Sequence, residues 1–165
     1  MTARIPYVRA DHPVFARVEA MGRPVLNLYR ALANQPAALD AFLGMSAYVR
    51  SGSSLDAGLR ELVILATAYE LGQDYEVAHH RGGVAPEKAA AVAPGGSLAA
   101  LDERERCAVE YARSAALTRT CDDALFERLK SQFSTEQIVD LVVTVAWYHL
   151  CAVILGSLEV ELETT

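Results

Sequence analysis

The densest group of titratable side chains in otherwise apolar surroundings lies in the stretch Gly72-Gln73-Asp74-Tyr75-Glu76-Val77-Ala78-His79-His80. Glu76 and His80 stand four positions apart, so they share one face if the stretch is helical. A carboxylate that contacts an imidazole orients the ring and raises its pKa, which suits proton transfer near neutral pH. His79 is adjacent, and only the four-residue spacing favours His80 as the working imidazole. An exposed Glu–His pair on a surface helix is the structural alternative.

A second glutamate, Glu61, stands inside the apolar run Leu59–Ala66, where it either faces solvent or is buried for a reason. Gly72 is expected to break the helix between Glu61 and Glu76, so periodicity alone does not bring them together. The Glu-x-x-His that ends at His79 has the spacing used by di-iron carboxylate bundles. Those bundles need two such motifs, and the sequence has no second one. We therefore expect neither a metal ion nor another cofactor.

Composition limits the classes of partner and compartment. The 165 residues include 15 Lys+Arg and 21 Asp+Glu, a formal net charge of −6, and 52% of them are hydrophobic, enough for one domain with a core. An acidic balance argues against nucleic-acid and anionic-membrane surfaces, which need clustered Lys and Arg. The cysteines Cys107, Cys121 and Cys151 have no C-x-x-C spacing, and the N-terminal stretch lacks the apolar region of a signal peptide. Both features favour a reducing cytoplasm.

Helical periodicity dominates the chain and strand signals are nearly absent, so we predict an all-α fold. Gly72 should end the helix before the Glu–His stretch, and Ser134 with Gln137 should form a capping box. The predicted helices cover about 14–33 with an interruption at 22–24 and a new start at Pro24, 36 to about 50, 55–71, 73–81, a short segment from 86, 102–117, a segment capped by Thr120, and Ser134 to about Glu161.

The last predicted helix is apolar on every side between Ile138 and Leu155. Its central charge, Asp140, would be costly in a membrane, so we interpret it as a buried helix of a soluble protein. A domain of this size has trouble surrounding such a helix alone, so we expect part of it at a subunit interface. We expect Asp140 to pair with an arginine. Trp147-Tyr148-His149 should pack in the core, with projection of Tyr148 or His149 into a site as the alternative.

The sequence from Leu55 to Val92, with Arg60-Glu61, Tyr75-Glu76 and His80, resembles the carboxymuconolactone decarboxylase family, which includes alkylhydroperoxidase D-like proteins. The resemblance continues over about 28–161. It implies an alkylhydroperoxidase D-like helical bundle over residues 28–165, preceded by an N-terminal extension over residues 1–27. It also implies a homo-oligomer, a trimer or hexamer, with active sites close to subunit interfaces.

The peroxidase branch of this family implies a C-x-x-C, a histidine and an upstream glutamate. The matching positions here are Gln73 and Glu76 for the cysteines, His80 for the histidine and Glu61 for the glutamate. Because peroxide reduction by disulfide exchange needs two thiols, the chain resembles the branch without them. That branch includes 4-carboxymuconolactone decarboxylase, which removes CO₂ from a lactone acid.

The resemblance therefore implies cofactor-free acid–base chemistry, a decarboxylation or related lyase step, on a small anionic lactone or aromatic-degradation metabolite. Glu61, Glu76 and His80 are the expected catalytic residues. A decarboxylase needs a cation for the substrate carboxylate, which Arg60 or Arg81 could supply. The expected substrate-binding residues are Tyr75, Gln73, Arg60, Arg81 and His149. The alternatives are a thiol peroxidase, disfavoured by the missing C-x-x-C, and a non-catalytic oligomeric binding protein that kept the fold.

Overall fold

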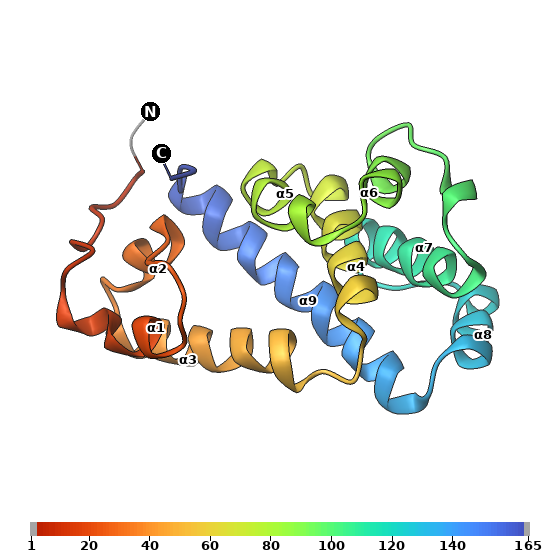
Figure 1. The fold of residues 1–165 in the computed structure, drawn as a ribbon, viewed down its shortest axis with the longest axis horizontal. Coiled ribbons are helices and arrows are strands. Elements are labelled where there is room, and N and C mark those ends of the chain that lie inside the picture. The colour runs from red at the N-terminus through yellow and green to blue at the C-terminus, as the bar shows by residue number, and fades with distance from the viewer. Residues whose placement is uncertain (1–2, 164–165) are drawn as a thin grey trace.

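The computed structural model describes residues 3–163, and every regular element in that range is helical (Figure 1). Residues 1–2 and 164–165, the outer ends of the predicted extension and domain, lie outside it. The absence of strands between residues 3 and 163 confirms the predicted all-α class. The elements are η1 (Pro13–Phe15), α1 (Ala16–Ala20), α2 (Asn27–Leu32), α3 (Pro36–Ala47), the π-helix η2 (Tyr48–Gly52), α4 (Ala57–Glu70), α5 (Asp74–His80), η3 (Arg81–Gly83), α6 (Pro86–Val92), η4 (Leu98–Ala100), α7 (Glu103–Thr118), α8 (Asp123–Gln132) and α9 (Thr135–Leu158).

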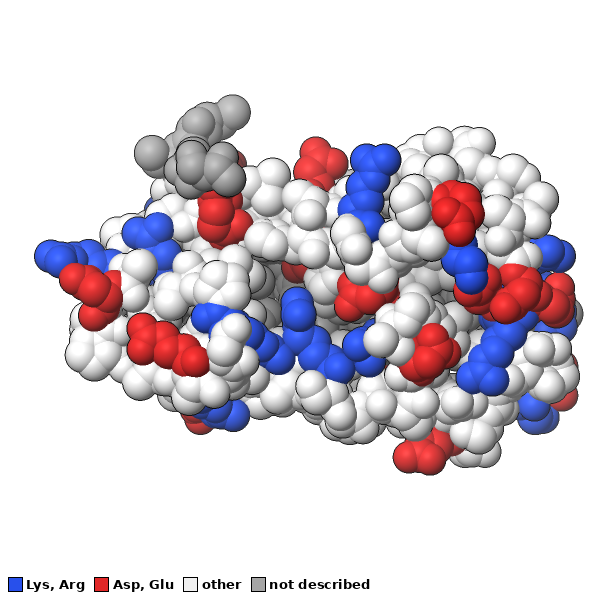
Figure 2. Space-filling view, in the orientation of Figure 1, with Lys and Arg blue, Asp and Glu red and all other residues white. Residues whose placement is uncertain are grey.

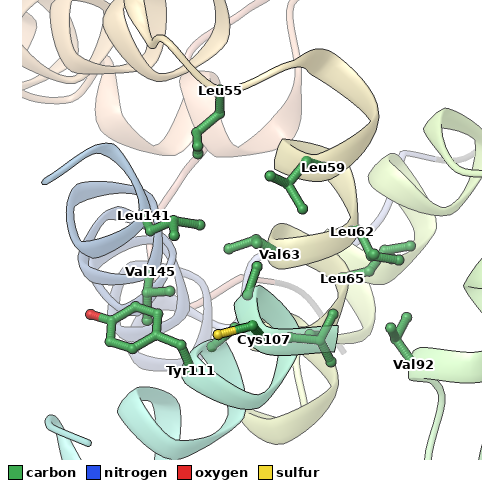
Figure 3. Packing of buried hydrophobic residues seen from close by; sticks show 14 of the residues in the cluster. Leu55, Leu59, Leu62, Val63, Leu65, Val92, Cys107, Tyr111, Leu141 and Val145 are labelled. Atoms are coloured by element: carbon green, nitrogen blue, oxygen red, sulfur yellow. The ribbon is translucent and has the colours of Figure 1, made fainter. Parts of the chain in front are cut away.

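Helix α9 runs diagonally through the molecule, with α1–α3 on one side and α4–α8 on the other (Figure 1). Its N-terminal half belongs to a core built with α4 and α7. Figure 3 shows Val63 of α4, Cys107 of α7 and Leu141 of α9 pointing toward one another, and all three are fully buried. Burial of this apolar surface is the main source of stability for the arrangement.

The C-terminal half of α9 belongs to a second core shared with the N-terminal helices. Trp147 lies against Phe42 of α3, with ring centroids 4.4 Å apart. Phe15 and Val18, within the segment predicted as an extension, are also fully buried in this core. Helix α9 therefore connects the two cores, with Leu141 and Val145 in the first and Trp147, Tyr148 and Cys151 in the second.

Local sequence signals placed several helix ends correctly. Gly72 follows α4 with a left-handed φ of +63°, which favours glycine because other residues meet a clash there. The capping box of Ser134 and Gln137 starts α9, as predicted. Pro36 is the first residue of α3, also as predicted.

Three predicted boundaries are wrong. Helix α2 begins at Asn27 rather than Pro24, because the Asn27 N–H donates to the distant Glu163 carboxylate at 2.6 Å and so gains a partner there. Asp122, not Thr120, caps α8 by accepting from a backbone N–H of its first turn. Helix α9 ends at Leu158 rather than near Glu161, because the next residue adopts a left-handed conformation.

Asp140 is buried in α9 and its partners are not arginines, which corrects the sequence-based expectation. One carboxylate oxygen accepts from the Tyr48 hydroxyl at 2.5 Å, and the other accepts from the backbone N–H and hydroxyl of Ser54 at 2.7 and 2.6 Å. Burial raises the pKa of Asp140, but these hydrogen bonds more than offset it and hold the pKa below the ordinary value. The carboxylate thus fixes the connection between η2 and α4 against α9.

One face of α9 remains uncovered within a single chain, and its burial at a subunit interface stays a prediction. Val139, Val142, Leu150 and Val153 are exposed, the last to 66% of its surface. The helix is long and apolar enough to cross a membrane by length and composition, although 44% of its most apolar window is buried in the protein. Lone apolar residues are ordinary on surfaces, but a row along one helix marks a surface that another element can cover.

Replacing Asp140 by Ala should lower the free energy of unfolding by about 2–3 kcal/mol, because it removes a charged acceptor and leaves the Ser54 N–H without its partner. Urea denaturation measures the loss. Glu127→Ala is the control, since Glu127 forms an exposed ion pair with Lys130 and should cost under about 1 kcal/mol. Equal losses in both variants would contradict the structural role assigned to Asp140.

Candidate active site

His80, the last residue of α5, lies between side chains from three helices and is only 4% exposed. Its Nδ1 is 2.6 Å from Glu61 Oε2 of α4. Its Nε2 is 3.0 Å from the Tyr148 hydroxyl of α9 and 3.4 Å from Glu76 Oε2, one turn earlier in α5. The structure therefore brings together the three residues predicted to be catalytic and adds Tyr148, whose projection into the site was predicted only as an alternative.

Two glycines make this convergence possible. The turn at Gly72 reverses the chain between α4 and α5, which places α5 beside the start of α4. Gly83 then passes close to Glu61, where a Cβ would be only 3.0 Å from the Glu61 Cγ. A side chain at position 83 would require the Glu61 side chain to shift by a few tenths of an ångström, which glycine avoids.

Charge, rather than burial, decides the protonation of this pair. Burial lowers the pKa of His80, but hydrogen bonds with Glu61 and Glu76 outweigh it, and the net pKa lies above the ordinary value. Burial raises the pKa of Glu61, yet the contact with His80 and the positive charges of Arg50 and Arg60 bring it below the ordinary value. Imidazolium and carboxylate are therefore both favoured near neutral pH.

Tyr148 is almost completely buried, and its burial keeps the pKa of the phenol well above the ordinary value. The group consequently remains a hydroxyl. When His80 is neutral, the Nδ1–H donates to Glu61 and the free Nε2 accepts from the Tyr148 hydroxyl. A buried carboxylate thus holds one nitrogen while the other can exchange a proton, which is the arrangement required of a general acid–base.

A cavity of about 30 Å³ opens beside Glu76, His80 and Tyr148. This space holds about two water molecules, or the end group of a small ligand. Trp147 and Arg50 also line it. The sequence analysis missed Arg50, because its side chain reaches the site from the π-helix η2. Such turns are frequent at functional sites, but this one has no recognisable signature in the sequence.

Tyr75 and His79 line the same cavity as His80, and both also contact Glu163. The Glu163 carboxylate accepts from the Tyr75 hydroxyl at 2.7 Å and contacts His79 Nε2 at 2.9 Å. His79 is partly exposed, whereas His80 faces the carboxylates of both Glu61 and Glu76. The geometry therefore distinguishes the two histidines in the way that the spacing had favoured.

The other predicted binding residues are scattered. Arg60 lies close enough to influence Glu61, and its buried Nε has no hydrogen-bond partner. Arg81 is exposed and does not line the cavity. The Gln73 amide is 3.5 Å from the backbone carbonyl of residue 152. His149 lines a separate apolar pocket with Tyr111 and Val142, away from His80.

The remaining reactive groups do not form a metal or dithiol site. Within residues 3–163, no group of three or more His, Cys, Asp and Glu side chains is placed to hold a metal ion. The three cysteines are free thiols, and burial raises the pKa of each. Cys151 lines the His80 cavity but has no second cysteine opposite it among the lining residues.

Comparisons with known proteins bear on the family and the fold of this chain. The sequence profile of the carboxymuconolactone decarboxylase family matches residues 36–114, which contain Glu61, Glu76 and His80. No curated protein matches the chain. Several solved structures do match, and their sequence identities are so low that the match shows a shared fold alone.

A peroxidase-related protein from Silicibacter sp. TM1040 superposes with a TM-score of 0.82 at 18% identity, over 98% of this chain and 92% of that one. A peroxidase-related protein with an alkylhydroperoxidase AhpD core, from Ralstonia eutropha JMP134, gives 0.78 at 19% identity over 99% and 93%. A variant of the debrominase Bmp8 in complex with 2,3,4-tribromopyrrole gives 0.82 at 19% identity over 99% and 93%. The predicted alkylhydroperoxidase D-like fold is thereby confirmed.

The His80 imidazole should titrate above pH 6.5, and Glu61→Gln or Glu76→Gln should each lower its midpoint, because each removes a negative charge beside the ring. NMR titration of the ring protons measures this. Glu70→Gln is the control, since Glu70 pairs with Arg113 instead.

The same pair should make stability depend on pH. The contribution of His80 is full below about pH 6.5 and disappears as pH rises through its raised pKa. That of Glu61 is present above about pH 4.5 and is lost as pH falls through its lowered pKa. A His80 midpoint at or below pH 6.5, unmoved by Glu76→Gln, would mean that the carboxylates do not control the imidazole.

Proposed function

We propose that this chain, whose residues 36–114 match the carboxymuconolactone decarboxylase family, is a cofactor-free enzyme that performs acid–base chemistry on small anionic metabolites. The proposed reaction is a decarboxylation or a related lyase step on a lactone acid or aromatic-degradation metabolite. The observation that carries the proposal is the buried His80 held by Glu61 and Glu76, with its Nε2 beside a cavity.

In the decarboxylation, the bond between the substrate carbon and its carboxylate breaks and CO₂ leaves. The electron pair stays on the substrate as an enolate, and one carbon then takes a proton. His80 can give that proton from Nε2 while Nδ1–H remains bound to Glu61, and solvent later restores it. Glu76 favours the protonated ring, and the Tyr148 hydroxyl holds Nε2 in place once the proton has left.

Thiol-dependent peroxide reduction is the disfavoured alternative. It needs an accessible thiolate and a resolving thiol. Gln73 and Glu76 occupy the positions of the two cysteines in that branch, and burial raises the pKa of Cys151, the one thiol at the cavity. A binding protein without catalysis is the second alternative, and the activity test below separates it from an enzyme.

We also propose that the working form is a cytoplasmic homo-oligomer, a trimer or hexamer, as the family resemblance implies. The support is the uncovered apolar face of α9, together with exposed Phe126 of α8 next to it. Covering that face with a second copy removes apolar surface from water, which favours association. Because α9 also carries Tyr148, association would stabilise the helix that holds part of the site.

His80→Gln should reduce the release of CO₂ from 4-carboxymuconolactone or a related lactone acid by about 10²-fold or more, the usual scale for loss of a general acid–base. Tyr148→Phe should cost less, because Nε2 loses a partner but keeps its proton. Cys107, Cys121 and Cys151 replaced together by Ser serve as the control and should leave turnover largely intact. Dithiol-driven hydroperoxide reduction that disappears in that triple variant would contradict the proposal.

Light scattering should give a particle of three or six times the chain mass of 17.9 kDa. Val153→Lys should shift it toward the monomer, because burying an unpaired charge in an apolar interface is costly. Leu162→Lys, which likewise puts a charge in place of an exposed apolar side chain but lies outside α9, is the control and should leave the mass unchanged. A stable monomer of the wild type at micromolar concentration would contradict the assembly.

A further inference from the structure

We infer that Arg50 binds the carboxylate group by which this site recognises its ligands, and that this group lies at the mouth of the His80 cavity. The inference rests on the proposed function and sharpens it, because it assigns the specificity for anionic substrates to one residue. That residue differs from both arginines, Arg60 and Arg81, that sequence reasoning selected.

Arg50 is the cation at the cavity itself. It lies in η2, is exposed, and lines the same cavity as Glu76, His80 and Tyr148. Burial raises the pKa values of Tyr148 and Cys151, and the positive charge of Arg50 lowers both in part. The electrostatic effect of Arg50 therefore extends to residues that line the cavity. Arg81 does not line the cavity at all.

Arg50 is also available to a ligand. Within the described chain it has no ion pair or hydrogen bond, whereas the nearby Arg17 pairs with Asp40 and Arg23 donates to Ser46. A guanidinium with free N–H groups is well suited to bind a carboxylate through two parallel hydrogen bonds. On the face that Figure 2 draws, Lys and Arg side chains gather across the middle, beside a hollow.

The charges inside the cavity require such a cation. Glu61 and Glu76 face a single imidazolium, and Arg60 offsets part of the charge of Glu61 from outside the cavity lining. An anion that approaches His80 through the cavity therefore still meets the Glu76 carboxylate. Without a further positive charge, repulsion would exclude the substrates that the proposed function needs. Arg50 supplies that charge on the solvent side of His80.

Size determines which part of the ligand Arg50 contacts. The cavity of about 30 Å³ admits only the end of a small molecule, so the remainder lies toward solvent, where Arg50 is exposed. A cation over a departing carboxylate would stabilise the ground state more than the transition state, because the charge leaves that group during the reaction. The carboxylate at Arg50 is therefore one that the product keeps, and simple carboxylates should bind without reacting.

The test uses Trp147, the only tryptophan of the chain, which lines the cavity and gives a single indole N–H signal in NMR. Wild-type protein is titrated with benzoate and succinate, and with benzamide as the uncharged counterpart. We expect saturable shifts with a carboxylate and none with benzamide. Arg50→Gln should weaken the binding at least tenfold, and Arg50→Lys should recover part of it. Arg9→Gln removes the same charge from an exposed pair with Asp11 and should change nothing.

Three outcomes would overturn the inference. Failure of both carboxylates to bind the wild type, equal binding by Arg50→Gln, or loss only in Arg60→Gln would each exclude Arg50 as the anion-binding residue. His80→Gln separates this inference from the proposed function, because it should retain saturable binding that depends on Arg50 while turnover is lost. Binding that depends on Arg50 in a protein whose turnover ignores His80 would support the anion site and refute the acid–base role.

Discussion

The contact between His80 and Glu61 is the interaction on which the arrangement of this molecule depends. A buried imidazolium is stable only if its charge is compensated, and here compensation comes from two carboxylates on two helices. Removing either partner of such a pair leaves an uncompensated charge, so α4, α5 and α9 must keep their positions together. The turn at Gly72 and the close approach of Gly83 are consequences of that requirement.

Helix α9 has three tasks that constrain one another. It joins the two cores, it holds Tyr148 against His80, and it presents an apolar row to the outside. Asp140 adds a polar anchor near its start, which fixes the η2 segment and with it Arg50. The position of the exposed cation at the cavity is therefore set by a buried carboxylate in another element, far away in the sequence.

The parts of this structure that follow local rules were predictable, and the parts that depend on distant contacts were not. The spacing of Glu76 and His80, the stop at Gly72 and the capping box at Ser134 are properties of a few neighbouring residues. The meeting of Glu61 with His80 depends on how two helices cross after a turn, and it came only from the family resemblance. Arg50 escaped detection because a π-helical turn directs it, and the start of α2 was misplaced because its partner is near the other end of the chain.

Glu163 joins chain ends that are far apart in sequence. Its carboxylate holds the first N–H of α2, the Tyr75 hydroxyl and the His79 ring. The contact with Asn27 closes a loop that contains most of the polypeptide, and the entropy of such closure grows only slowly with length, by about 0.6 kcal/mol per doubling. Loss of the Glu163 contacts would therefore not stay local, because it would release the start of α2 and the outer face of α5 in one step. Glu163 thus takes part in the cooperative unfolding of the residues around the site.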